Sequence, residues 1–273
     1  MNRDPASAGI FGWPVAHAKS PIIHRFWLGK LGLDGDYGRF PVHPDDLRAA
    51  IRSLPALGLR GVNITVPHKI AVMAHLDHVN ASARAVGAVN TVTVGVDGRL
   101  RGTNTDVDGI LEPLRHLDLA GRRVVIAGAG GAARAALAAA VIAGAGSVTV
   151  LARDRAKASA LLEAGSVPGS AMGFADAWGG TDVGLFFNAT TLGMTGQPLL
   201  PVDLAVLPAG ATVFDAVYVP LETSLLAAAR ARGLPVIDGL QMLIGQAATA
   251  FAAFYSAAAP RRFDAELRTL LTA

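Results

Sequence analysis

The sequence contains no cysteine and very little lysine, and both absences exclude particular chemistry. Without cysteine, the 273-residue chain has no disulfides, no thiolate metal ligands and no cysteine nucleophile. This composition suits a reducing compartment, and we expect a cytoplasmic protein. Arginine supplies nearly all of the positive charge, so a lysine within a motif stands out. The lysines are Lys19, Lys30, Lys69 and Lys157.

Charge is also scarce, since charged residues make up 16% of the chain and its formal net charge is +3. No basic run is interleaved with aromatic residues, so we expect no nucleic-acid partner. The first residues lack a sustained apolar segment and do not resemble a signal peptide. The uncharged stretch 135–152 is rich in alanine and contains Gly144 and Gly146, which indicates a helix, a turn and a strand rather than a membrane span.

The N-terminal part alternates short β-type runs with helical ones from Gly9 to about Leu100, which predicts a βαβαβ-like unit. Ser20 is expected to be the N-cap of a helix whose first residue is Pro21. A strand over 61–66, a helix after Pro67 and a strand over 88–94 are predicted next.

The C-terminal part begins with a helix at about Thr105, and then continuous apolar strands alternate with helices. Such strands are typical of a parallel sheet that is covered on both faces. We therefore expect an α/β protein with an N-terminal α/β substrate domain and a Rossmann-type, doubly wound nucleotide-binding domain. The expected domains are 1–104, completed by C-terminal helices within 240–273, and 105–239.

A glycine-rich turn follows the predicted strand 124–127 and precedes an alanine-rich helix. It fits the G-x-G-x-x-A dinucleotide fingerprint, in which small residues let the backbone approach a pyrophosphate at a helix N-terminus. A tight strand-to-helix turn also uses glycine, but this context favours dinucleotide binding. The candidate cofactor residues here are Gly128, Ala129, Gly130, Gly131 and Ala132.

The tip of the next predicted strand distinguishes NADP from NAD. Arg153 and Lys157 could pair with a 2′-phosphate, and the tip itself has no acid that would hold ribose hydroxyls. Asp154 opposes this, either by accepting ribose hydroxyls or by repelling a phosphate. An ordinary helix start with solvated basic residues is the alternative. We expect NADP as the cofactor and keep NAD as the alternative.

Polar clusters recur in the N-terminal part, at 17–21, 63–69, 90–91 and 103–106. Asn63 and Thr65 are two residues apart on a strand, so their side chains share a face that could line a cleft. Each cluster also has a structural explanation, because Asn, Asp and Thr cap helices and turns and lysine is usually solvated.

Together with the fingerprint, these clusters resemble the shikimate dehydrogenase family across nearly the whole chain. The family pattern G-x-P-[IV]-x-H-S-x-S-P-x-x-H is seen here from Gly12 to His24. The further matching blocks are 63–69, 87–91, 102–106, 188–190, 215–218 and 238–246.

The resemblance implies an NADP-linked reversible reduction of 3-dehydroshikimate to shikimate in aromatic amino-acid biosynthesis, with no metal. It places the family's catalytic pair on Lys69 and Asp106. Such a pair is needed because an alcohol that loses hydride must also release a proton to an acid/base group. Further positions fall where the family contacts the nicotinamide end of the cofactor, and these are Ala216 and Gly239. The implied substrate-binding residues are Ser20, Thr65, Asn90, Asp106, Tyr218 and Gln246.

Two departures from the family pattern keep alternatives open. Ala18 replaces the first serine of H-S-x-S, which removes one hydroxyl donor to the substrate carboxylate, and Asp154 replaces the usual threonine of Asn-Arg-Thr. A quinate/shikimate or aminoshikimate-type dehydrogenase, with NAD as an alternative cofactor, is the alternative enzyme. A non-catalytic metabolite sensor is the other class, against which the retained Lys69 and Asp106 argue. Either a monomer or a homodimer is compatible with the sequence.

Overall fold

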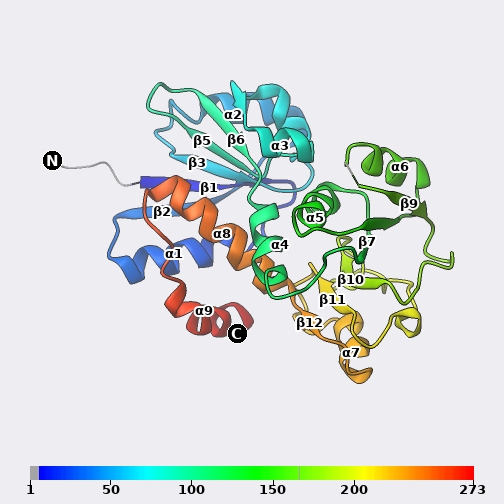
Figure 1. Cartoon of the computed structure of the whole chain (residues 1–273). Coiled ribbons are helices and arrows are strands. Elements are labelled where there is room, and N and C mark those ends of the chain that lie inside the picture. Colours follow the sequence, from blue (N-terminus) through cyan, green and yellow to red (C-terminus); the bar gives the residue numbers. More distant parts are fainter. Residues whose placement is uncertain (1–5, 166) are drawn as a thin grey trace. The chain divides into compact units, whose positions relative to one another are not determined.

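The structure, a computed structural model, describes residues 6–165 and 167–273. Their contacts divide the chain into two compact units (Figure 1). The first unit contains the residues up to Thr105 together with Ile244–Ala273, and the second contains Asp106–Leu243. The sequence had placed the boundaries at 104/105 and 239/240.

The first unit is built on a mixed sheet of strand order β2-β1-β3-β5-β6-β4. The three strands β1, β2 and β3 are mutually parallel, as a βαβαβ-like unit requires, whereas β5 runs antiparallel to both β3 and β6. The strands are β1 (Ala6–Gly12), β2 (Gly35–Pro41), β3 (Gly61–Ile64), β4 (His78–Val79), β5 (Thr91–Val94) and β6 (Leu100–Thr103). Its helices are α1 (Ser20–Leu31), η1 (Pro44–Asp46), α2 (Leu47–Ser53), η2 (Ala71–His75), α3 (Ala81–Val86), η4 (Arg261–Phe263) and α9 (Asp264–Thr272).

One local prediction in this unit is wrong. Ser20 is not the N-cap of α1 but its first residue, because Lys19 occupies the cap position, although its side chain caps no N–H group of the helix. The predicted helix after Pro67 is present as the short 3₁₀ helix η2 and not as an α-helix. The carbonyl of Lys69 accepts a hydrogen bond from the Val89 N–H at 2.8 Å, and this pairing competes with the i→i+4 bond that an α-helix would need there.

Helix α8 (Gly239–Tyr255) begins in the second unit, and from Ile244 onward it belongs to the first. Its Ala250 and Phe254 lie in one apolar cluster with Ile10 of β1 and Tyr37 of β2. The C-terminal segment therefore contributes to the core of the N-terminal sheet.

The second unit has a fully parallel sheet of order β12-β11-β10-β7-β8-β9. Counted along this unit from its other edge, the order is the 3-2-1-4-5-6 arrangement of Rossmann folds, which reverses between β7 and β10. The strands are β7 (Arg123–Ala127), β8 (Ser147–Leu151), β9 (Gly169–Met172), β10 (Val183–Asn188), β11 (Thr212–Asp215) and β12 (Val236–Ile237). The remaining helices of the unit are α4 (Asp106–Leu114), α5 (Gly131–Ile142), α6 (Arg155–Glu163), η3 (Leu204–Val206) and α7 (Ser224–Ala231).

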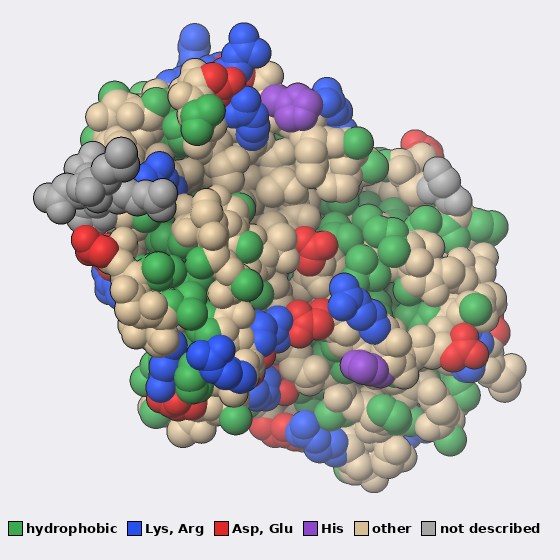
Figure 2. All heavy atoms as spheres, turned by 60° about the vertical axis from the view of Figure 1, so that its left-hand side comes forward, with side chains coloured by type: hydrophobic (Ala, Val, Ile, Leu, Met, Phe, Trp, Pro, Cys, Tyr) green, Lys and Arg blue, Asp and Glu red, His purple; other side chains and the backbone are tan. Residues whose placement is uncertain are grey.

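The surface carries charges of both signs. On the face drawn in Figure 2, Lys and Arg side chains are interspersed with Asp and Glu. Charges of opposite sign also form ion pairs, such as Arg25–Asp36 and Arg123–Asp182. Within residues 6–165 and 167–273, no helix is long and apolar enough to cross a membrane.

Candidate active site

The polar centre of the first unit is the buried side chain of Asn90. Its Oδ1 accepts from the backbone N–H of Thr105 at 2.7 Å, and its Nδ2 donates to Thr105 Oγ1 at 3.0 Å. Gln246 of α8 joins this pair, since its Oε1 lies 3.5 Å from Asn90 Nδ2 and 3.4 Å from Thr105 Oγ1. The structure thus brings together two predicted substrate residues, Asn90 and Gln246, that are 156 positions apart in the chain.

A second layer of buried polar groups supports Asn90. The Tyr37 hydroxyl donates to Asn63 Oδ1 at 2.6 Å, and Asn63 Nδ2 donates to Thr91 Oγ1 at 2.9 Å and to the Asn90 carbonyl at 3.2 Å. Neither Tyr37 nor Asn63 was among the predicted site residues. The shared face of Asn63 and Thr65 pointed to Asn63, whereas no local pattern pointed to Tyr37.

The segments that carry Lys69 and Asp106 adjoin this network through the backbone. Lys69 is half-buried, and its carbonyl binds the N–H of Val89, the residue before Asn90. Asp106 is 4% exposed and follows Thr105 directly in the chain, as the first residue of α4 and of the second unit. The Asn90 side chain therefore binds the backbone next to Asp106, while the backbone of the preceding residue, Val89, binds Lys69.

Ser20 and Ala18 lie at the start of α1. Ser20 is buried, and so is Tyr37, whose pKa is raised well above its usual value by burial. Ala18 is also buried, and its carbonyl accepts from Arg39 Nε at 3.0 Å and Nη2 at 2.6 Å. The Arg39 guanidinium therefore fixes the turn that presents Ser20.

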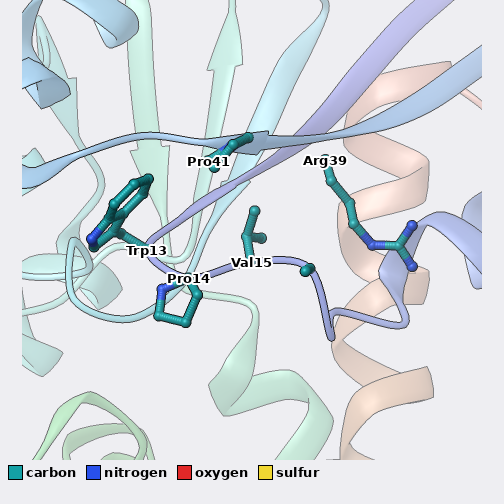
Figure 3. Close-up of a pocket in the computed structure, with 6 residues that line it drawn as sticks. Trp13, Pro14, Val15, Arg39 and Pro41 are labelled. Carbon is teal, nitrogen blue, oxygen red and sulfur yellow. The ribbon is translucent and has the colours of Figure 1, made fainter.

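An open pocket of about 320 Å³ lies beside this turn (Figure 3). Figure 3 shows that the guanidinium of Arg39 points away from Trp13 and Pro14, so the charge of Arg39 is directed at the turn rather than at these rings. None of the predicted site residues lines the pocket. Its lining residues are Trp13, Pro14, Val15, Ala16, Arg39 and Pro41.

In the second unit the glycine turn lies where the strand order reverses. Gly128 has φ +112°, and a Cβ there would lie 3.1 Å from Thr190 Cγ2, so this position requires glycine. Gly130 is the N-cap of α5, and a Cβ on it would meet nothing within 4 Å. Because no side chain caps α5, its first N–H groups and the space in front of them suit a pyrophosphate.

The tip after β8 shows how Asp154 is used. Asp154 is the N-cap of α6, where its Oδ1 accepts from the Lys157 N–H at 3.2 Å and its Oδ2 lies 3.7 Å from Lys157 Nζ. Arg155 pairs with Asp176 at 2.7 Å. Arg153 is exposed and forms no ion pair within the described part of the chain. Asp154 therefore has the capping role of an ordinary helix start.

Three further predicted residues of the second unit lie near its C-terminal strands: Ala216 and Tyr218 follow β11, and Gly239 begins α8. A Cβ on Gly239 would lie 2.6 Å from the Ala216 carbonyl and 2.5 Å from that of Val217, so glycine is needed for this close approach. Tyr218 is half-buried, and burial raises its pKa. Tyr218 belongs to the second unit. The other predicted substrate residues Ser20, Thr65, Asn90 and Gln246 belong to the first.

Known proteins resemble the chain along nearly its whole length. The family model "Shikimate dehydrogenase substrate binding domain" matches residues 10–92. Shikimate dehydrogenase (NADP⁺) of Sphingopyxis alaskensis is 48% identical over 267 residues, which cover 97% of each chain. The chain belongs to the shikimate dehydrogenase family.

Solved structures of this family show the same two-unit α/β fold. Shikimate 5-dehydrogenase of Thermus thermophilus in complex with NADP(H) and shikimate is 36% identical, with a TM-score of 0.87 over 97% of this chain and 98% of that one. The fold also occurs with a different name, since 5-ketofructose reductase of Gluconobacter sp. strain CHM43 is 31% identical with a TM-score of 0.90 over 99% and 100% of the chains. The predicted family and fold class are confirmed.

Proposed function

We propose that this chain catalyses the reversible, NADP-linked reduction of 3-dehydroshikimate to shikimate. The observation that carries the proposal is the hydrogen bonding around Asn90, in a chain whose relatives are shikimate dehydrogenases. The Asn90 side chain binds the N–H of Thr105, next to Asp106, and the N–H of Val89, next to Asn90, binds the Lys69 carbonyl. The first unit would bind the substrate, and the second would bind the cofactor. We expect a cytoplasmic enzyme, and sedimentation would distinguish a monomer from a homodimer.

The substrate is a small carboxylic acid with several ring hydroxyls, and the proposed binding side chains match this chemistry. The amides of Asn90 and Gln246 can each donate to and accept from hydroxyl groups. Ser20 donates its hydroxyl to the carboxylate in this proposal. Thr65 and Tyr218 bind ring hydroxyls.

Hydride leaves or enters the ring carbon, so the oxygen on that carbon must lose or gain a proton in the same reaction. The Lys69 ammonium would donate this proton to the carbonyl oxygen during reduction, and the neutral amine would take it back during oxidation. Asp106 would hold the ammonium in place and bind a hydroxyl of the substrate. When bound, NADP supplies or accepts the hydride.

The residues that would hold NADP lie at the carboxyl ends of the strands of the second unit. The glycine turn and the uncapped start of α5 would bind the pyrophosphate. Arg153, and Lys157 beside it, would pair with the 2′-phosphate. Ala216 and Gly239 would adjoin the nicotinamide end, where a larger residue at 239 would displace the backbone after β11.

An absorbance assay for reduced nicotinamide tests the proposal directly. Purified protein is mixed with shikimate and NADP⁺, and parallel reactions contain quinate or NAD⁺. We expect the highest kcat/KM with shikimate and NADP⁺. Higher efficiency with quinate or NAD⁺ would favour the alternative dehydrogenase. Binding of shikimate without any turnover would favour a metabolite sensor.

A further inference from the structure

The ends of two neighbouring strands in the second unit carry polar residues that are completely buried. Asn188 ends β10 and Asp215 ends β11, and the two residues are register partners in the parallel sheet. Both are 0% exposed. Ala127, the last residue of β7, is the partner of Asn188 on its other side, so all three strands end at the same level.

The Asp215 carboxylate accepts hydrogen bonds from three directions. Its Oδ1 accepts from Asn188 Nδ2 at 2.8 Å and from the Val217 N–H at 3.0 Å, while its Oδ2 accepts from Thr223 Oγ1 at 2.7 Å. Thr223 in turn caps α7 by accepting from the Leu226 N–H at 3.2 Å. Within residues 6–165 and 167–273 the carboxylate pairs with no cation. Burial raises the pKa of Asp215, which expresses the cost of placing a carboxylate there.

On one side this carboxylate orders the loop against the glycine turn. Asn188 Nδ2 is held by Asp215, and Asn188 Oδ1 accepts from the N–H of Thr190 at 3.0 Å and from its hydroxyl at 2.7 Å. The methyl group of Thr190 lies only 3.1 Å from where a Cβ of Gly128 would be. A shift of the 188–190 loop would therefore change the space at the glycine turn.

On its other side the same carboxylate orders the segment after β11. It binds the N–H of Val217, and the carbonyls of Ala216 and Val217 are the backbone atoms that approach Gly239. Ala216 is also tied to β10, because its N–H donates to the Asn188 carbonyl at 3.0 Å. These contacts link the glycine turn, which the proposed function assigns to the pyrophosphate of NADP, with Ala216 and Gly239, which it assigns to the nicotinamide end.

We propose that Asp215 is a positioning residue for NADP. Through its hydrogen bonds to Asn188 and Val217, its carboxylate sets the spacing between the glycine turn and the Ala216–Gly239 contact. The inference rests on the proposed function, because that function assigns these two places to the cofactor. Asp215 itself touches neither the pyrophosphate nor the nicotinamide in this proposal. Its removal should therefore weaken NADP binding without changing the binding of shikimate.

Steady-state kinetics and calorimetric titration with NADP⁺ test the inference on the full chain. For Asp215→Ala we expect KM and Kd for NADP⁺ to rise about tenfold, with KM for shikimate and kcat at saturating NADP⁺ within about twofold of wild type. Asp215→Asn should recover most of the affinity, because its amide oxygen can still accept from Asn188 and Val217 while the Thr223 hydroxyl turns to accept. A merely structural role would lower the melting temperature of Asp215→Ala and leave KM for NADP⁺ unchanged.

Asp182→Ala is the matched control, since Asp182 precedes the same strand β10 at its other end and pairs with Arg123 on the surface. It should leave KM for NADP⁺ unchanged. If Asp215→Ala does not fold, Asn188→Ala cuts the same link from β10 and should raise KM for NADP⁺ several-fold. An unchanged KM for NADP⁺ in the folded variant, beside an active wild type, overturns the inference alone. A wild type that neither binds NADP⁺ nor oxidises shikimate overturns the proposed function instead.

Discussion

Polar groups are arranged in opposite ways in the two proposed binding sites. In the first unit, amides and hydroxyls around Asn90 form a buried side-chain network, and each member depends on the atoms of its neighbours. In the second unit, no side chain caps the first N–H groups of α5, and a Cβ on Gly130 would meet no atom within 4 Å. We therefore expect the loss of side-chain atoms to impair binding or catalysis in the first unit, and the addition of side-chain atoms to impair cofactor binding in the second.

The largest effect is expected where an atom is removed from the proposed proton path. Lys69→Ala should lower kcat by about 10² or more, because positioned acid/base catalysis typically contributes 10² to 10⁴. KM for shikimate should change much less. Lys30→Ala is the control, since Lys30 lies in the same unit and pairs with Glu266 on the surface. Near wild-type kcat in Lys69→Ala would remove Lys69 from the mechanism.

The first unit should also be the more sensitive to acid, through His24. This ring is fully buried, stacks on Tyr37 at 4.1 Å and has no hydrogen-bond partner on either nitrogen among the described residues. Burial lowers its pKa from 6.5 to about 3. Below pH 6.5 the unfolded chain therefore binds a proton that the folded chain does not, and the free energy of unfolding falls as the pH decreases.

The expected loss from His24 is about 2 kcal/mol between pH 7.5 and pH 5, at roughly 1.4 kcal/mol per pH unit once the unfolded histidine is protonated. Denaturant unfolding at both pH values measures it, with His24→Phe as the variant that cannot titrate. Equal pH dependence in wild type and variant would contradict the assignment. The contribution of Asp215 to the pH dependence of the free energy of unfolding has the opposite sign, because a carboxyl with a raised pKa in the folded state adds stability as the pH falls.

Addition of one methyl group should impair the second unit. Gly130→Ala places a Cβ where no protein atom lies within 4 Å, so the fold should tolerate it while the pyrophosphate site becomes smaller. We expect KM for NADP⁺ to rise about tenfold, which corresponds to about 1.4 kcal/mol. Gly29→Ala is the matched control, because its Cβ also meets nothing and Gly29 lies within α1 of the first unit. Equal KM values for NADP⁺ in the two variants would place the pyrophosphate elsewhere.

A smaller effect is expected from an atom added to the first unit. Ala18→Ser restores a hydroxyl next to Ser20, and a hydrogen bond to a charged acceptor contributes about 1.5 to 3 kcal/mol before displaced water is considered. KM for shikimate should fall several-fold, with kcat changed less. Because Ala18 packs in an apolar cluster with Val15 and Tyr37, thermal unfolding is measured as well. Lower stability with an unchanged KM would show that position 18 does not face the carboxylate.

The smallest effect concerns the choice between NADP and NAD. Asp154→Thr keeps a side chain that can cap α6 but removes the negative charge next to Arg153 and Lys157. The ratio of kcat/KM for NADP⁺ to that for NAD⁺ should rise by a few-fold. Asp203→Thr, at another capping position of the same unit, is the control. A lower ratio in Asp154→Thr would mean that Asp154 helps to bind the cofactor.

Local patterns in the sequence predicted much of the second unit. Continuous apolar strands between helices are typical of a parallel sheet, and the order β9-β8-β7-β10-β11-β12 confirms it. The sequence did not predict β9 (Gly169–Met172), because this strand is short and its residues are at most partly buried.

In the first unit, the antiparallel direction of β5 was not predictable from the sequence. Alternation of apolar residues shows which face of a strand is buried, but not the direction in which the neighbouring strand runs.

The sequence by itself determined the glycine turn and the polar residues next to strand ends, because backbone sterics and short spacings are local properties. Only the tertiary structure decided which of these residues meet. Gln246 reaches Asn90 across 156 positions, Tyr37 donates to Asn63 from another strand, and Asp154 caps a helix. Hydrogen-bond partners of this kind depend on the packing of distant segments, and so does the burial that lowers the pKa of His24.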